Sequence, residues 1–143
     1  MTYQCADITI IVSTLIQYHK EICMATVKGP DFIALQVPDV EKAARFYSEI
    51  IGLQRAPESP PGAVLFLTSP IPFAVRKPQQ PLGSSPLGHG VALWFLCDNA
   101  IELYSKLKAN GVTLLDEPVP GPFGVTFHFK DIDGYIITIH DKA

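Results

Sequence analysis

The chain has 143 residues and a formal net charge of −3, with a sequence pI near 5.7. Hydrophobic residues make up 48% of it and charged residues 17%, a balance that is typical of a folded domain and excludes a disordered chain. The acidic balance and the lack of a basic run exclude an electrostatic nucleic-acid surface and a polybasic membrane-binding segment. One domain with a substantial core is expected, with neither nucleic acid nor a membrane as partner.

Residues 1–30 are expected to form an N-terminal extension, with an extra strand or helix in it. Its apolar run ITIIVSTLI is far shorter than the roughly 20 residues of a membrane-spanning helix. It also lacks the preceding basic residues of a signal peptide, and Met24 is an alternative natural start. The three cysteines, Cys5, Cys23 and Cys97, form no CxxC pair, which favours a reducing, cytoplasmic setting.

Two similar segments follow along the chain, FIALQVPDVEKAARFYSEIIGL (32–53) and VALWFLCDNAIELYSKLKANGV (91–112). In each, an alternating strand leads to an aspartate, Asp39 or Asp98, that is suited to cap a helix N-terminus. The helical stripe that follows ends at a glycine, Gly52 or Gly111. Both matched pairs are 59 residues apart, so the sequence predicts an internal repeat with this offset.

Short extended segments come after each predicted helix, separated by proline-rich or glycine-rich turns. They read LQRAP, AVLFLT and PFAVRK in the first repeat, and VTLL, FGVTFHF and YIITIH in the second. We therefore expect an α+β domain (31–141) of two βαβββ modules, about 31–76 and 90–141, joined by a mobile linker (77–89). Alternation along the penultimate strand leaves open whether Phe127 and Phe129, or instead His128, point inward.

The segments IALQVPDVEKAARFYSEIIGL, LKANGV and KDIDGYIITIHD resemble the vicinal oxygen chelate superfamily of glyoxalases, fosfomycin- and bleomycin-resistance proteins and extradiol dioxygenases. The last segment is similar to the family's Asp-Pro-Asp-Gly hairpin, with Ile132 in place of proline. The resemblance covers about residues 31–141. It implies an open, partial eight-stranded barrel with helices outside, a ligand cleft inside, and a homodimer.

The resemblance also implies where a metal would bind. Metal-using members have His or Gln seven residues before the capping acid and Glu on the final strand, and these positions hold Phe32, Val91 and Thr138 here. His89 and His140 are each two residues away, a shift of about 6.6 Å along a strand. Metal–nitrogen bonds are only about 2 Å long, so neither histidine replaces a family ligand. No metal and no other cofactor is therefore expected.

Strand parity predicts which side chains face the cleft. In the first strand Ile33, Leu35 and Val37 are expected to pack on the helix, with the alternate residues toward the cleft. In the second module Trp94 and Leu96 are expected to pack on the helix. The expected ligand-binding residues are Phe32, Gln36, His89, Val91, Leu93, Phe95, Thr138 and His140.

Some of these residues have alternative roles. Gln36 either anchors a ligand or joins a structural network, because a buried amide needs partners. Cys97 precedes a helix, whose dipole lowers thiol pKa values, but it is expected to be a small core residue. By default, His128 is expected to be a surface or packing residue.

The leading prediction is a metal-independent small-molecule-binding protein that holds an apolar or aromatic ligand in the cleft. The alternative is a metal-dependent lyase, isomerase or dioxygenase with a displaced metal site, or an enzyme with His89 or His140 as general base. A third possibility is a module that binds a protein partner. The sequence identifies no catalytic residue.

Overall fold

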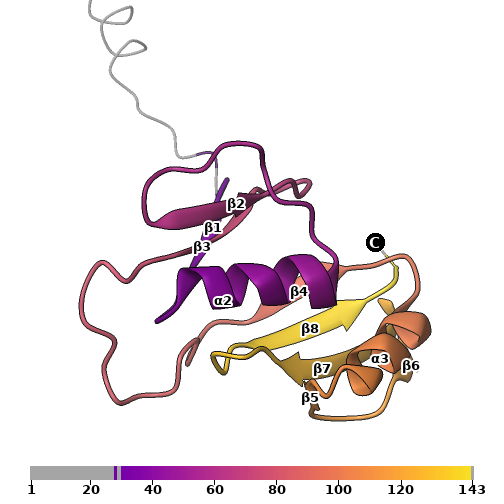
Figure 1. The fold of residues 1–143 in the computed structure, drawn as a ribbon. Coiled ribbons are helices and arrows are strands. Elements are labelled where there is room, and N and C mark those ends of the chain that lie inside the picture. The colour runs from indigo at the N-terminus through magenta and orange to yellow at the C-terminus, as the bar shows by residue number, and fades with distance from the viewer. Residues whose placement is uncertain (1–27, 29, 143) are drawn as a thin grey trace, which may run out of the picture. The chain divides into compact units, whose positions relative to one another are not determined.

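The computed structural model of the chain describes residue 28 and residues 30–142 (Figure 1). The strand or helix predicted within residues 1–30 lies outside this part of the chain, as do Cys5 and Cys23. The two-module domain begins at Asp31. No helix among the described residues is long and apolar enough to span a bilayer.

The domain has two helical segments and two sheets. The first module contains β1 (Ile33–Gln36), α2 (Val40–Arg45) with its π-helical continuation η1 (Phe46–Ile51), β2 (Ala63–Phe66) and β3 (Phe73–Arg76). The second contains β4 (Leu93–Leu96), α3 (Ala100–Ala109), β5 (Thr113–Leu114), β6 (Val119–Gly121), β7 (Gly124–Lys130) and β8 (Ile136–His140).

The two sheets repeat the same topology. In the first sheet (order β1-β3-β2), β1 runs parallel to β3 and β3 antiparallel to β2. In the second (order β4-β8-β7-β5), β4 runs parallel to β8 and β8 antiparallel to β7, while β6 also pairs with β7. An isolated bridge from Arg55 to Phe66 stands where the first module would have its fourth strand. The predicted α+β fold of two repeated modules is confirmed, and the sheets do not close into a barrel.

The first helix starts where the predicted repeat puts it, and the second starts one residue later. Asp39 caps the first helix by accepting a hydrogen bond from the Lys42 amide (3.0 Å), as predicted. The second helix is capped by Asn99, which accepts from the Glu102 amide (3.0 Å), so the prediction of Asp98 as cap is wrong.

The first helix is one residue longer than the second between its cap and its terminating glycine. The π-helical segment η1 accommodates this residue, because its hydrogen bonds reach one residue further back than in an α-helix. At its end the Gly52 amide donates to the Tyr47 carbonyl (3.1 Å). Gly52 (φ +97°) and Gly111 (φ +70°) both adopt the left-handed conformation, as expected for glycines that end helices.

This one-residue difference reverses the predicted orientation of β4. Strand side chains alternate, so a shift of one residue moves each of them to the other face. Leu93 is only 6% exposed and belongs to the core, and Phe95 packs against the same core. Trp94 and Leu96 lie on the opposite face and are exposed. The prediction that Trp94 and Leu96 pack on the second helix is therefore wrong.

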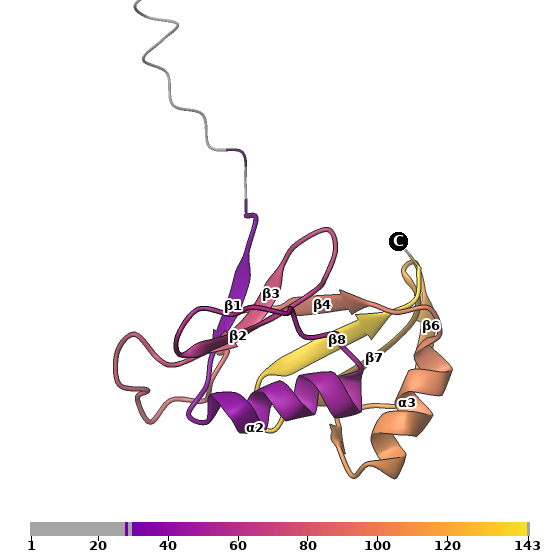
Figure 2. The ribbon, with the colours of Figure 1, turned by 45° about the horizontal axis from the view of Figure 1, so that its top comes forward.

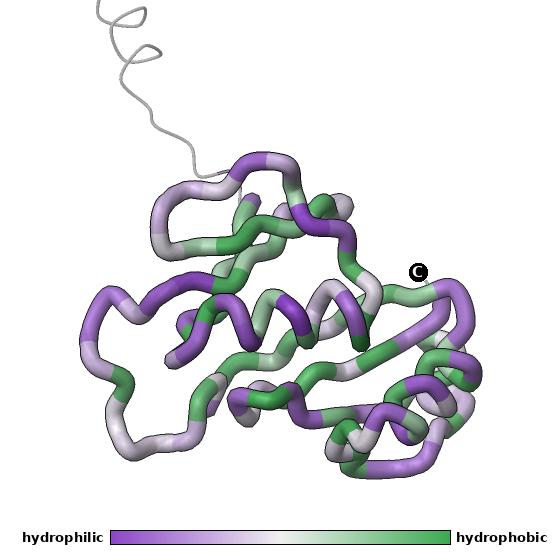
Figure 3. The backbone as a smooth tube through the Cα atoms, in the orientation of Figure 1, coloured by the Kyte–Doolittle hydropathy of each residue, from purple (hydrophilic) through white to green (hydrophobic). Residues whose placement is uncertain are grey.

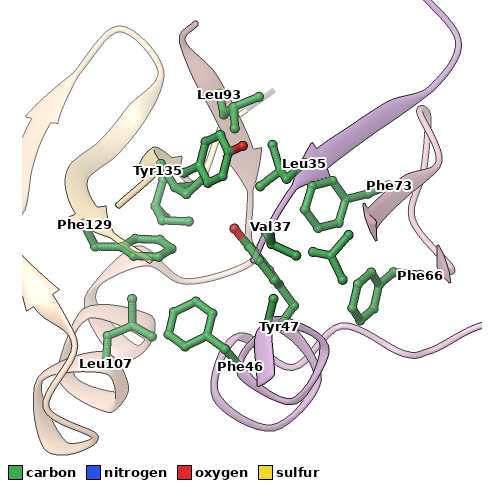
Figure 4. Packing of buried hydrophobic residues seen from close by; sticks show 14 of the residues in the cluster. Leu35, Val37, Phe46, Tyr47, Phe66, Phe73, Leu93, Leu107, Phe129 and Tyr135 are labelled. Atoms are coloured by element: carbon green, nitrogen blue, oxygen red, sulfur yellow. The ribbon is translucent and has the colours of Figure 1, made fainter. Parts of the chain in front are cut away.

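Both helices lie on one side of the strands (Figure 2), and the core fills the space between them and the sheets (Figure 4). Leu35 of β1 and Val37, the residue after β1, point into it, as predicted. Phe127 and Phe129 of β7 also face the helices, which leaves His128 on the other side of the sheet. The strands are mainly hydrophobic along their length, whereas the segment after β3 begins with a hydrophilic stretch (Figure 3).

Candidate functional site

The face of each sheet that points away from the helices is called its outer face. On the outer face of the second sheet, Trp94 of β4 is paired with Thr138 of β8, and Thr138 is paired with His128 of β7. Thr138 is only 6% exposed, so it forms the floor between its two larger neighbours. The next row along the strands consists of Leu96, His140 and Thr126.

Three rings form an aromatic cluster at one end of this face. The Trp94 ring centroid lies 5.5 Å from that of Phe123 and 5.7 Å from that of His140, both in edge-to-face geometry. Such geometry is favourable because the positive ring edge meets the negative ring face. Trp94 is nevertheless 49% exposed and Phe123 54% exposed. The cluster is an aromatic surface that is open to solvent.

Each histidine on this face has its Nδ1 atom next to an acceptor. His128 Nδ1 lies 2.6 Å from Asp116 Oδ2, and His140 Nδ1 lies 3.1 Å from the carbonyl oxygen of Lys142. A carboxylate or carbonyl oxygen only accepts, so Nδ1 carries the proton of each neutral ring. The Nε2 atoms of both rings are therefore hydrogen-bond acceptors.

The Asp-Ile-Asp-Gly hairpin fixes the start of β8 through a buried carboxylate. Asp131 Oδ1 accepts from the amides of Asp133 (2.9 Å) and Tyr135 (2.8 Å), and Oδ2 accepts from the Tyr47 hydroxyl (2.6 Å). Burial, reinforced by the charge of Asp131, raises the pKa of Tyr47 well above its usual value, so this hydroxyl remains a donor. The Tyr135 hydroxyl donates to the Gln36 carbonyl (2.7 Å). The hairpin thus joins the two modules.

Asp141 fixes the other end of β8. Its carboxylate accepts from the Val125 amide (2.7 Å) and from the Ala100 amide (3.2 Å) in the first turn of α3. Gly124 has φ +78°, and a Cβ at this position would meet the Asp141 carboxylate. The hydrogen bond from the Val125 amide to Asp141 holds the GPFG turn, which carries Phe123, against the end of β8.

The structure separates the eight predicted ligand-binding residues. Thr138 and His140 lie together on the outer face of the second sheet. Phe32 and Gln36 lie on the opposite side of the first strand from its core residues. His89 and Val91 lie in the exposed segment before β4. Leu93 and Phe95 lie on the core side of β4. The prediction that Leu93 and Phe95 face the cleft is wrong, because Asn99 rather than Asp98 begins the helix.

Gln36 and Cys97 have structural surroundings. The Gln36 side-chain carbonyl accepts a hydrogen bond from the Gln79 backbone amide (2.8 Å). Of the two predicted roles for Gln36, the structure therefore shows the one in a structural hydrogen-bond network. Cys97 packs against the core, as predicted. Burial raises the pKa of its thiol and outweighs the lowering effect of the Asn99 amide.

Two small cavities, among others of up to about 390 Å³, lie away from the aromatic cluster. One of about 170 Å³ is mainly apolar and is bounded by Phe73, Phe95 and the 68–71 loop, among other residues. Another of about 140 Å³ lies on the outer face of the first sheet and includes Phe32 and Arg76. Cavities of about 150 Å³ admit a ligand the size of benzene, whereas typical ligand pockets are about 300 Å³ or larger.

The metal positions implied by the family do not fit a metal. With Asn99 as cap, the second-module position becomes Ala92 instead of Val91. Phe32 and Ala92 carry no ligand atom, and Thr138 offers only a hydroxyl. Within residues 30–142, His, Cys, Asp and Glu side chains form no group of three that could hold a metal ion.

Sequence reasoning missed three parts of the outer face. The sequence prediction puts Trp94 on the helix side, treats Phe123 only as part of a turn, and contains no contact between Asp116 and His128. A better choice between adjacent capping residues at 98 and 99 would have found Trp94, because asparagine caps helices as well as aspartate does. The contact between Asp116 and His128 depends on the course of a loop and has no local sequence signal.

Comparisons with known proteins agree with the topology. The family model described as Glyoxalase/Bleomycin resistance protein/Dioxygenase superfamily matches residues 29–139. The uncharacterized protein YetH of Bacillus subtilis is 28% identical over 120 residues, covering 76% of this chain and 94% of YetH.

Two solved structures described as members of this group are similar in fold. One from Nocardioides has a TM-score of 0.68 at 18% identity, covering 90% of this chain and 93% of its own. One from Sphaerobacter thermophilus has a TM-score of 0.64 at 20% identity, covering 81% and 98%. At these identities the likeness shows the fold alone. Together with the family match, it means that this chain belongs to the glyoxalase/bleomycin resistance protein/dioxygenase superfamily.

Proposed function

We propose that this protein is a metal-independent small-molecule-binding member of its superfamily and that it holds an aromatic ligand on the outer face of the second sheet. The observation that carries the proposal is the exposed cluster of Trp94, Phe123 and His140. Exposed aromatic rings provide hydrophobic area and ring–ring contacts for an aromatic ligand. Thr138 and His140 supply sparse polar groups for orienting the ligand, which is the usual composition of a small-molecule site.

The proposed site keeps two predicted residues and replaces others. Thr138 and His140 remain from the sequence prediction. Trp94 takes the place of Leu93 and Phe95, because those side chains face the core. Phe32 lines the small cavity on the first sheet, so a Phe32 variant distinguishes binding in that cavity from binding at the proposed site.

The proposal is tested with para-nitroanisole as a neutral aromatic probe. Trp94 is the only tryptophan of the chain, so its indole N–H gives a single, readily identified NMR signal. We expect a saturable shift of this signal with Kd of about 1 mM or lower. In Phe123→Ala the Kd should be about tenfold higher, because a Phe123 ring covered by the ligand contributes more than about 1.4 kcal/mol to the binding free energy. Phe32→Ala is the matched control and should bind as the parent does. No shift, or loss of binding in Phe32→Ala alone, would contradict the proposal.

Metal analysis separates the binding protein from the enzyme alternative. We expect purified protein to hold only substoichiometric metal, and EDTA to leave its Tm unchanged, because a bound metal stabilises the folded state by mass action. Stoichiometric zinc, nickel, manganese or iron that disappears in the double variant His89→Ala/His140→Ala would favour a displaced metal site and an enzyme.

We also propose that the protein forms a homodimer, as the family resemblance implies. Large apolar side chains that remain exposed on several elements support this proposal, among them Phe32, Leu67, Val91 and Leu96. Sedimentation equilibrium should give twice the chain mass of 15.7 kDa at micromolar concentration. A mass equal to that of one chain would rule the dimer out.

A further inference from the structure

We infer that His128, oriented by Asp116, is the hydrogen-bond and proton acceptor of this site, and that the ligands it selects are aromatic compounds with a weakly acidic hydroxyl group. The inference rests on the proposed function, because it concerns the same face of the second sheet. It adds the chemical class of the ligand and a residue that selects it.

Asp116 holds His128 by two hydrogen bonds. Its Oδ1 accepts from the His128 backbone amide (2.7 Å), and its Oδ2 lies 2.6 Å from Nδ1 of the ring. The carboxylate therefore fixes both the position and the tautomer of the ring. The Nε2 lone pair is left to accept from a ligand.

The strand pairing places this acceptor beside the aromatic cluster. His128 is directly opposite Thr138, which is directly opposite Trp94. Neighbouring strands are about 4.8 Å apart, so the Trp94 and His128 backbones are separated by about 10 Å. A single aromatic ring lying over Thr138 would have the indole on one side and the imidazole on the other. Its hydroxyl would then point toward Nε2.

The chemistry requires only a proton. The ligand O–H donates to Nε2, and full transfer breaks that O–H bond and forms an N–H bond. The products are an aryloxide and an imidazolium paired with Asp116, with no change of oxidation state. A methyl ether of the same ring keeps the aromatic contacts but has no proton to donate, so it separates this interaction from ring binding.

A purely structural role for Asp116 makes a different prediction. If the carboxylate only fastens its loop to β7, altering His128 would change stability without changing ligand preference. His140 is a second candidate acceptor, because its Nε2 also lies on this face. The experiment must therefore compare two ligands and both histidines.

The test is a titration of the full chain with para-nitrophenol and para-nitroanisole, followed by the Trp94 indole NMR signal. We expect the phenol to bind at least about tenfold more tightly than the ether, as for one hydrogen bond to a site with a charged partner. His128→Gln should abolish this preference, so that the phenol and the ether bind with equal affinity. Asp116→Asn should reduce it, because the tautomer is no longer fixed. His89→Gln, in the exposed segment before β4, is the control and should retain it.

The outcomes separate this inference from the proposed function. Equal affinity for the two compounds, or a preference for the phenol that survives His128→Gln, overturns the inference about His128. Binding of the ether still supports the proposed function in either case. A preference lost in His140→Gln but kept in His128→Gln assigns the acceptor to His140 and also overturns it. If neither compound binds, the proposed function fails as well. Amide NMR spectra of each variant verify that it is folded.

Discussion

Replacing Asp131 with alanine is expected to lower the free energy of unfolding by about 4 kcal/mol, since it removes a buried carboxylate and leaves its donors without partners. Those donors are the Tyr47 hydroxyl and the amides of Asp133 and Tyr135. Urea unfolding measures the change. Asp98→Ala is the matched control: Asp98 is exposed and does not cap α3, so its loss should cost less than about 0.5 kcal/mol. A loss below about 1 kcal/mol for Asp131→Ala would contradict the role of the hairpin.

Tyr47→Phe tests the same network through pH. Burial and Asp131 raise the pKa of Tyr47 in the folded protein above the unfolded value of 10.0. The stability that this group contributes is therefore fully present below pH 10 and is lost as the pH rises toward the folded pKa. We expect Tyr47→Phe to be less stable than the parent at pH 7 and to lose stability less steeply above pH 10. Parallel curves in urea unfolding between pH 7 and pH 11 would contradict this prediction.

Gly124→Ala is the second substitution with a large expected effect, about 3 kcal/mol. Part of the cost arises because φ +78° is unfavourable for a residue with a Cβ, by about 1–2 kcal/mol. The rest arises because the new methyl group would displace the Asp141 carboxylate from the amides of Val125 and Ala100. Gly90→Ala is the control, since Gly90 has φ +83° and a Cβ there would meet no atom within 4 Å. Equal losses of unfolding free energy in the two variants would show that the Asp141 hydrogen bonds contribute nothing to stability.

Much of the fold is predictable because its signals are local. The capping Asp39, the terminating glycines Gly52 and Gly111, and the alternation along β8 each act within one element. The orientation of β4 was not predictable from a constant repeat offset. Asp98 and Asn99 are adjacent and both suited to cap a helix, and the extra residue in η1 hides the difference between them.

The candidate site was predictable only where a strand had a fixed register. Thr138 and His140 follow from the hairpin and from alternation, whereas Trp94 was placed on the wrong face with the rest of β4. Phe123 and Asp116 lie outside the strands, and their positions depend on contacts with β7 and β8. Such contacts between distant parts of the chain have no local sequence pattern.

The most direct test of the central claim is the position of a bound aromatic ring. Intermolecular nuclear Overhauser effects between para-nitroanisole and the protein report which side chains surround it. Binding on the outer face of the second sheet predicts effects to the Trp94 indole, the Phe123 ring and the Thr138 methyl group. Effects to Phe32 and Leu65 of the first-sheet cavity, without any to Trp94, would contradict the claim.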